Sequence, residues 1–321
     1  MKILFMGTPD FAVPILNALI TRHEICAVVT QPDRPRGRGQ AMAFSAVKQW
    51  AAEKSLPVLQ PETLKHPAAQ AEIGAFEAEA FVVAAYGLFL PKKVRDMPKF
   101  GCINVHGSLL PQYRGASPMQ RTILNGDTET GITIIHMSRG IDTGDMILRR
   151  AIPVGAEERI GALHDRMAVL GGECILEALA QLENQTAKRI PQDEAAATCA
   201  PMISKEDGHI NWHEPSVQIK NRLRAMDPWP GTYALYEGQV LKVWDCVPVD
   251  FSLSDSEPLA VKPPGAEVPG TVLAVDSAKG FSVKTGDGAV WVTEVQAVGG
   301  RRMKTADYLR GHEVRVGVVL G

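Results

Sequence analysis

The sequence has few cysteines, and no two of them are closely spaced. There are five, an odd number without a Cys-x-x-Cys pair: Cys26, Cys102, Cys174, Cys199 and Cys246. This pattern argues against a disulfide framework and against a zinc site. We therefore expect reduced thiols and a cytoplasmic protein.

Long hydrophobic runs and an excess charge of one sign are also absent. No segment approaches about 18 consecutive apolar residues, and the apolar run before Gly7 is too short for a signal peptide. We expect neither a membrane span nor secretion. Lys and Arg number 34 against 36 for Asp and Glu, which gives a net charge of -2 at neutral pH. An anionic partner must therefore bind at a local basic patch.

The common nucleotide and zinc motifs are missing as well. Residues 6–11 contain one glycine, at the place where a dinucleotide-binding domain has the motif GxGxxG. Neither a Walker A loop nor an HExxH motif occurs in the chain. The sequence therefore gives no support to NAD binding, nucleotide hydrolysis or zinc proteolysis.

The first part of the chain alternates strand-like and helix-like segments. With 321 residues and 45% hydrophobic content, the chain is expected to form two globular domains at about 100–200 residues each. Residues 1–185 predict βα units around a largely parallel sheet with both faces covered. The predicted strands are 2–6, 25–30, 80–85, 102–106 and 131–136. A helix over 160–182 closes this domain, and the Pro-containing segment 186–208 is expected to be a linker.

Residues 209–321 show a different pattern. A predicted helix at 217–225 is followed by apolar segments of strand length at 240–249, 270–275 and 289–298, separated by Gly, Asp and Pro. Short strands at this spacing, without helices between them, favour a small antiparallel β-barrel.

The segment from Gly101 to Pro118 joins an apolar strand to a polar, glycine-marked loop. Alternate residues of an extended strand face the same side, so Asn104 and His106 share one face of the strand. Burying two polar side chains there costs free energy unless they have partners or meet a substrate. A single histidine at a strand end is more often structural, so this pattern alone leaves both interpretations open.

A carboxylate completes a candidate catalytic set. Asp142 lies between Gly140 and Gly144. Such a loop can bring the carboxylate close to a ligand, or the carboxylate simply caps its own turn through a local hydrogen bond. Asn104, His106 and Asp142 together supply an amide donor, a titratable imidazole and a carboxylate that can orient the ring. This set suits direct acyl transfer through an oxyanion. Ser108 is disfavoured as a nucleophile because the GxSxG elbow is absent.

These residues resemble the folate-dependent formyltransferases. That family has Asn-x-His, then Ser-Leu-Leu-Pro, then an Asp in a Gly-rich loop, which match residues 104–106, 108–111 and 140–144. The resemblance covers nearly the whole chain and is to the branch that acts on initiator methionyl-tRNA. It is carried further by residues 7–11, 31–35, 37–39, 85–88, 203–207 and 227–230.

The resemblance implies a fold and a reaction. The fold is α/β, a Rossmann-like catalytic domain followed by a smaller OB-like β-barrel domain that binds tRNA. The reaction is transfer of the formyl group of 10-formyltetrahydrofolate to the α-amino group of methionine on initiator tRNA, for translation initiation. The folate co-substrate supplies the activated one-carbon unit, so no metal is expected. We also expect a monomer.

The resemblance implies site residues too. Asn104, His106 and Asp142 match the catalytic positions of the family. The positions that match the folate-binding motif or a loop expected near the pterin are Ser108, Leu109, Leu110, Pro111, Tyr86 and Gly87.

A basic segment is the candidate tRNA contact. Residues 31–48 carry an excess of three positive charges and include Arg34, Arg36 and Arg38. Prolines and glycines there favour a loop that orders on a phosphate backbone, although a solvated basic loop explains the charge equally well. In the resembling family this loop enters the acceptor stem, with Arg38 at the important arginine. Residues 301–315 carry a second excess of three positive charges.

Three rival functions share parts of this pattern. Nucleotide-sugar formyltransferases and 10-formyltetrahydrofolate hydrolases would use the same Asn, His and Asp, but they leave the basic loop without a role. A noncatalytic RNA-binding protein would explain the barrel and leave the catalytic set unexplained, in a chain that is not basic overall.

Overall fold

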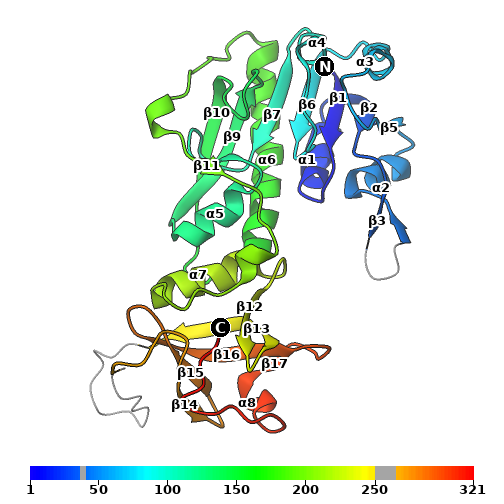
Figure 1. Cartoon of the computed structure of the whole chain (residues 1–321). Helices are drawn as coiled ribbons and strands as arrows, with labels where there is room; N and C mark the ends of the chain where they lie inside the picture. The colour runs from blue at the N-terminus through cyan, green and yellow to red at the C-terminus, as the bar shows by residue number, and fades with distance from the viewer. Residues whose placement is uncertain (37–40, 250–264) are drawn as a thin grey trace. The chain divides into compact units, whose positions relative to one another are not determined.

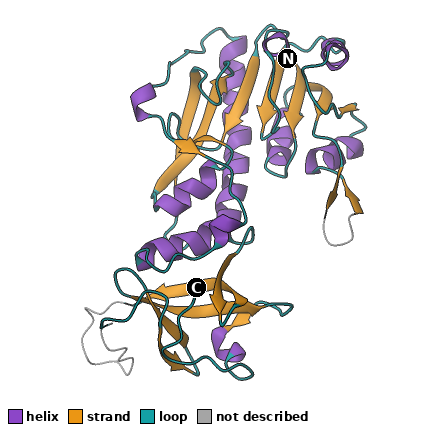
Figure 2. Cartoon of the chain, in the orientation of Figure 1, coloured by secondary structure: helices purple, strands orange, loops and turns teal. Residues whose placement is uncertain are grey.

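The chain folds into two compact units. The computed structural model describes residues 1–36, 41–249 and 265–321. The first unit comprises Met1–Met119, Glu129–Pro153 and Ala162–Pro201, and the second comprises Gln120–Thr128, Val154–Gly161 and Met202–Gly321. Helices and strands alternate along the first unit, whereas strands dominate the second (Figures 1 and 2).

A seven-stranded sheet forms the centre of the first unit. Its strands, in order across the sheet, are β10 (Met146–Pro153), β9 (Glu129–His136), β7 (Cys102–His106), β6 (Ala80–Ala84), β1 (Lys2–Gly7), β2 (Glu24–Val29) and β5 (Val58–Leu59). From β7 to β5 neighbouring strands are parallel, as the sequence pattern predicts. Strand β9 runs antiparallel to both β7 and β10. The Rossmann-like α/β prediction is therefore confirmed, with one reversed strand.

Helices connect the strands of this unit and cover the sheet (Figure 1). They are α1 (Ala12–Leu19), α2 (Ala46–Glu53), α3 (Pro67–Gly74), α4 (Lys92–Arg95), α5 (Pro118–Asn125) and α6 (Ile160–Glu183), of which α5 and α6 begin or end in the other unit. A Cβ on Gly171 of α6 would lie 3.1 Å from Val105 of β7 and 3.2 Å from Ile15 of α1. Helices α6 and α1 therefore pack closely on the face of β7 that carries Val105, which a side chain at Gly171 would disturb.

The opposite face of the sheet buries a second apolar layer. It includes Leu4, Met6, Val29, Val83 and Cys102 from the strands, with Ile73 and Val94 from α3 and α4. Because side chains alternate along a strand, Asn104 and His106 project on the Cys102 side of β7. The site described below therefore lies on the sheet face opposite α6.

The second unit is built on one antiparallel sheet. Its strands are β12 (Thr232–Tyr236), β13 (Gln239–Pro248), β16 (Ala289–Ala297), β15 (Gly280–Lys284) and β14 (Val272–Asp276) in that order, with β17 (Met303–Lys304) beside β16. Among the described residues, the helices of this unit include α7 (Ser216–Met226) and α8 (Thr305–Tyr308), together with most of α5 (Pro118–Asn125). The predicted helix and three strand segments of this region agree with α7, β13, β14 and β16. The OB-like closure of this sheet stays a prediction.

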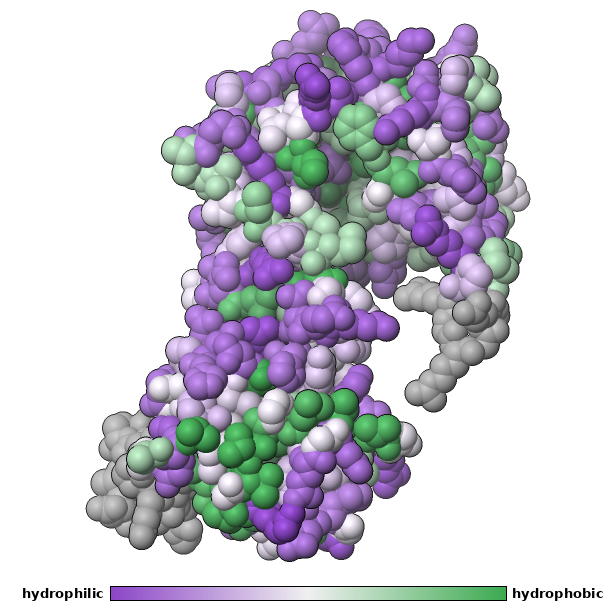
Figure 3. Space-filling view, in the orientation of Figure 1, coloured by the Kyte–Doolittle hydropathy of each residue, from purple (hydrophilic) through white to green (hydrophobic). Residues whose placement is uncertain are grey.

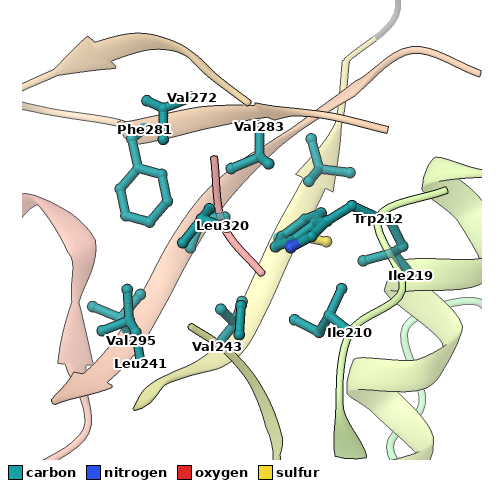
Figure 4. Packing of buried hydrophobic residues seen from close by; sticks show 14 of the residues in the cluster. Ile210, Trp212, Ile219, Leu241, Val243, Val272, Phe281, Val283, Val295 and Leu320 are labelled. Atoms are coloured by element: carbon teal, nitrogen blue, oxygen red, sulfur yellow. The ribbon is translucent and has the colours of Figure 1, made fainter. Parts of the chain in front are cut away.

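The core of the second unit explains why α7 forms where it does. Ile219 and Leu223 are four residues apart, on one face of the helix, and both are buried. They belong to the same apolar cluster as Val243, Phe281 and Val283 of the sheet (Figure 4). Tertiary packing of this stripe thus stabilises a helix of only 11 residues.

Outside the cores the surface is mixed. Figure 3 shows hydrophilic side chains over much of the visible face, with apolar residues among them. Among the helices that the structure describes, none combines the length and the apolar character needed to cross a membrane.

Candidate active site

The structure brings Asn104, His106 and Asp142 together. Asn104 and His106 are only 9% and 5% exposed on β7. The Asn104 amide donates from Nδ2 to Oδ1 of Asp142 at 3.3 Å, and Nδ1 of His106 lies 3.5 Å from Oδ2 of the same carboxylate. The loop that follows β9 therefore carries Asp142 across the polar face of β7.

The second ring nitrogen of His106 fixes its protonation pattern. Nε2 lies 2.9 Å from the carbonyl oxygen of Tyr113. A carbonyl oxygen only accepts hydrogen bonds, so Nε2 is the donor and carries the proton in the neutral ring. Nδ1 is then the unprotonated nitrogen of the neutral ring, and it faces Asp142.

Asp142 is held in an unusual backbone conformation. Its φ is +52°, in the left-handed region that non-glycine residues rarely adopt. A side chain at Gly144 would overlap the carbonyl oxygen of His136, so only glycine fits two residues later. The Gly115 N–H donates to Oδ2 of Asp142 at 2.9 Å. The Asp142 carboxylate thus accepts from Asn104 and Gly115 while it faces His106.

The Ser108–Pro111 loop is held by its own hydrogen bonds. The Ser108 hydroxyl, which is fully buried, donates to the Gln112 carbonyl at 2.6 Å. Thr133 of β9 donates to the Ser108 carbonyl at 2.7 Å and accepts from the Leu110 N–H at 3.0 Å. Leu110 is buried, whereas Leu109 and Pro111 are partly exposed. Because its proton is committed to this loop, Ser108 is poorly placed to act as a nucleophile.

Two sequence motifs far apart along the chain meet at Tyr86. Thr8 and Gln31 each donate a side-chain hydrogen bond to the Tyr86 carbonyl, both at 3.0 Å. The Tyr86 side chain is 2% exposed and its hydroxyl has no partner among the described residues. Burial raises the pKa of Tyr86 to about 12. Gly87 follows with a φ of +82°, so the chain turns sharply here.

The basic segment is only partly described. Arg34 is exposed at the start of β3 (Arg34–Arg36), which pairs with β4 (Ala41–Ala43) in a short hairpin. Arg38 lies outside the described residues, as does the side chain of Arg36. The Lys48 ammonium forms an ion pair with Asp33, and hydrogen bonds from Lys48 and Gln60 lower the pKa of Asp33. The one acid of this segment is thus paired with its lysine.

The second basic segment, 301–315, is more neutral than its own sequence indicates. Arg302 pairs with Asp227 and Glu294, and Arg315 pairs with Glu237. All three acids lie outside residues 301–315, so a count within the segment misses them. Its capacity to attract phosphate is correspondingly lower.

Several residues of this site are not evident in the sequence. Gly115, Arg114 and Gln192 contact Asp142 or its partners, yet Gln192 lies 50 residues further along the chain. The only signal for Gly115 is its place in the glycine-marked loop after His106.

No candidate metal site is found in the part of the chain that the structure describes. It holds no group of three or more His, Cys, Asp or Glu side chains arranged for a metal ion.

The chain matches two family models. Residues 1–179 match the family described as formyl transferase, and residues 202–313 match the formyl transferase C-terminal domain. Full-length relatives are similar as well. The methionyl-tRNA formyltransferase of Caldanaerobacter subterraneus subsp. tengcongensis is 44% identical over 324 residues, with 100% of both chains covered. That of Geobacter sulfurreducens is also 44% identical, over 322 residues, with 100% of this chain and 97% of the relative covered.

Solved structures share the fold at low identity. WlaRD, a sugar 3N-formyl transferase, is 18% identical with a TM-score of 0.62, over 94% of this chain and 99% of its own. HypX from Aquifex aeolicus, in complex with tetrahydrofolic acid, is 19% identical with a TM-score of 0.59 over 99% of this chain. The chain spans 50% of the length of that HypX structure.

Proposed function

Because this chain belongs to the formyl transferase family, as a full-length relative of the methionyl-tRNA formyltransferases, we propose how its residues perform that family's reaction. The chain is a one-carbon transferase. It transfers the formyl group of 10-formyltetrahydrofolate to the α-amino group of methionine on initiator tRNA, for translation initiation. The observation that supports our assignment of the chemistry is the convergence of Asn104, His106 and Asp142 on one face of β7.

The reaction requires a nucleophilic amine and stabilisation of negative charge. The methionine amine must lose a proton as it attacks the formyl carbon, while charge develops on the formyl oxygen. The Asn104 amide is a donor for that oxygen, and the His106 imidazole becomes a second donor once Nδ1 has taken up the amine proton. The Asp142 carboxylate lies 3.5 Å from Nδ1 and orients the ring.

The same nitrogen of His106 can accept the amine proton. In the neutral ring Nδ1 has a free lone pair, because Nε2 donates to Tyr113. A ring that takes the proton at Nδ1 keeps its hydrogen bond from Nε2 to Tyr113. It can then pass that proton to the tetrahydrofolate nitrogen as the bond between this nitrogen and the formyl carbon breaks. We infer that proton transfer takes place at Nδ1 and that Asp142 orients and balances the ring.

The folate co-substrate, when bound, supplies the activated formyl group. We assign its binding to Ser108, Leu109, Leu110, Pro111, Tyr86 and Gly87. The internal hydrogen bonds of the Ser108–Pro111 loop give it a fixed shape, and the Tyr86 carbonyl is held by two donors.

We assign the tRNA contact to Arg34, Arg36 and Arg38. Arg34 is exposed on a short hairpin, and the neighbouring acid, Asp33, is already paired with Lys48. The arginine charge is therefore not cancelled by that acid and is available to phosphate. The partners of the chain are initiator methionyl-tRNA and the folate co-substrate.

Three further features belong to the proposal. We propose that the protein acts in the cytoplasm as a monomer. We propose that the second unit closes into an OB-like barrel that binds tRNA. We also keep the division into a catalytic domain at 1–185, a linker at 186–208 and a C-terminal domain at 209–321.

The experiment that tests the function measures labelled formyl transfer from 10-formyltetrahydrofolate. The acceptors are methionyl initiator tRNA and, as a control, free methionine, each with the unmodified protein and with Asp142→Ala. We expect product on tRNA only, and its loss in the variant. Release of free formate, or formylation without need for Asp142, would contradict the proposed site.

A further inference from the structure

A segment far from the catalytic residues in sequence supports the Asp142 loop. After α6 the chain returns along the first unit, and Ile190 exchanges two backbone hydrogen bonds with Met146 of β10, at 2.8 and 2.9 Å. Two residues later, Nε2 of Gln192 donates to the carbonyl oxygens of Asp142 and Gly144, at 2.7 and 2.8 Å. Both amide protons of Gln192 are thus directed at the loop that carries Asp142.

Arg114 binds the oxygen atom of the same Gln192 side-chain amide. Its Nε and Nη2 atoms donate to Oε1 of Gln192 at 3.0 and 2.9 Å, and its Nη1 and Nη2 atoms donate to the Glu194 carboxylate at 2.9 and 2.8 Å. Arginine only donates hydrogen bonds, so the amide oxygen must face Arg114 and the amide nitrogen must face the two carbonyls. Hydrogen bonding to Glu194 raises the pKa of Arg114, a side chain that is already charged at neutral pH.

The loop needs support because its conformation is costly. A left-handed backbone at a non-glycine residue such as Asp142 costs free energy and persists only where its surroundings hold it. Gln192 holds the backbone on one side. On the other side, the Gly115 N–H holds the carboxylate.

Gly115 itself is positioned by the same returning segment. Arg114 and Gly115 form β8, which pairs in parallel with β11 (Cys199–Ala200). A Cβ at Gly115 would lie 2.7 Å from the Ala200 carbonyl oxygen, at a φ of +124°, so this close pairing requires glycine. Residues 190–200 therefore reach Asp142 twice, through its backbone and through its carboxylate.

We propose that Gln192, fixed by Arg114, is a positioning residue that sets the Asp142 carboxylate against His106 and Asn104. This inference rests on the proposed role of Asp142 in catalysis. A displacement of about 1 Å at a catalytic group can lower the rate about a hundredfold. Loss of the Gln192 donors should therefore lower kcat about 10- to 100-fold, with the KM values for folate and tRNA changed less than about twofold.

The sharpest variant is Gln192→Glu. It keeps the size of the side chain and its contact with Arg114, but it replaces two donors with an acceptor that faces two carbonyl oxygens. Gln181→Glu is the matched control, because among the described residues the Gln181 amide hydrogen-bonds the Glu177 carboxylate of the same helix and no group of the Asp142 loop. We expect the control to retain the kcat of the unmodified protein.

A second variant tests whether a loss of activity comes from misfolding. Arg114→Lys keeps the charge and leaves Gln192 in place, but it loses the planar group that holds both Gln192 and Glu194. We expect a smaller fall in kcat, about 3- to 10-fold, in protein whose thermal unfolding is within a few degrees of the unmodified chain. Unchanged kcat in both Gln192→Glu and Arg114→Lys would overturn the proposal.

A double-mutant cycle with Asp142→Asn separates this inference from the proposed function. If Gln192 acts through Asp142, Gln192→Glu has little further effect on single-turnover rates in the Asp142→Asn background. Fully additive losses, or a rise in KM alone, would overturn the positioning role while the role of Asp142 stands. Full activity of Asp142→Asn would instead overturn the proposed catalytic role itself, and with it this inference.

Discussion

Strands β6 and β7 lie next to each other and are equally buried, but they bury different chemistry. Every residue of β6 is apolar and at most 4% exposed. On β7, the register partner of Val83 is Asn104, and His106 follows two residues later. Both polar side chains find their partners in loops, at Tyr113 and Asp142, and not in the sheet.

The difference shows what a buried strand can and cannot tolerate. An apolar strand is stabilised by packing alone, so β6 needs no particular loop beside it. A polar strand is stable only where other groups complete its hydrogen bonds. In β7 the loops that complete those bonds also carry Asp142, so stability and the proposed chemistry depend on the same contacts.

The largest effect should follow from removing the imidazole of β7. We expect His106→Ala to lower kcat about 10²- to 10⁴-fold, because a proton-transfer group is lost, and to change tRNA binding little. Steady-state kinetics with methionyl initiator tRNA and a separate tRNA-binding measurement check this. An equal loss of binding and of rate would contradict it.

The second prediction replaces a polar residue of β7 with an apolar one, as in β6. Asn104→Leu replaces a buried amide with an apolar side chain of similar size, so we expect kcat to fall about 10²- to 10³-fold. The Asp142 carboxylate also loses the donor to its Oδ1 atom, which should cost about 1–3 kcal/mol of unfolding free energy. The two measurements are the formyl-transfer rate and thermal unfolding. A large loss of stability with the rate preserved would show that Asn104 acts only in folding.

The converse change is on β6. Val82→Ala removes two methyl groups from a fully buried position, and we expect about 1–3 kcal/mol of lost unfolding free energy. Activity at temperatures well below unfolding should remain within about twofold, because Val82 has no part in the proposed chemistry. Denaturant titration and an activity assay on the same preparation check both parts. A fall in kcat comparable to that of Asn104→Leu would contradict the contrast between the two strands.

The smallest effect concerns the thiols. Burial raises the pKa of Cys102, the first residue of β7, to about 12, and that of Cys246 to about 12. At pH 8 such a thiol is about one part in ten thousand thiolate, so it should resist alkylation. Cys199 is exposed and should react first. We expect about one fast-labelled thiol in the folded chain and five after denaturation, by mass spectrometry. Rapid labelling of Cys102 would show that β7 is less buried than β6.

The sequence predicts the local features of the site and misses the distant ones. Period two places Asn104 and His106 on one face, and the structure has both on one face of β7 beside Asp142. The reversed direction of β9 was not predictable, since an apolar strand looks the same in either direction. Gln192 was missed because its partner lies 50 residues away, within a segment that the sequence pattern assigns to a linker.

The net charge counted within a segment is an equally limited guide, because distant acids can pair with its arginines. Counting within residues 301–315 indicates a strongly basic patch, but Asp227, Glu237 and Glu294 neutralise two of its arginines. Such pairings come from the fold and are invisible to a count along the chain. The domain boundaries and the OB-like closure remain predictions.

Strand β10 has a consequence for behaviour at high concentration. It forms one edge of the seven-stranded sheet, and an open edge is a template for pairing with a strand of another molecule. Ile190 covers this edge at Met146. Further along, the strand carries the exposed Arg149 and ends at Pro153, which lacks an N–H to donate. The pairing with Ile190, the charge and the proline together disfavour edge-to-edge aggregation. Strand β10 therefore also helps to keep the protein in solution at high concentration.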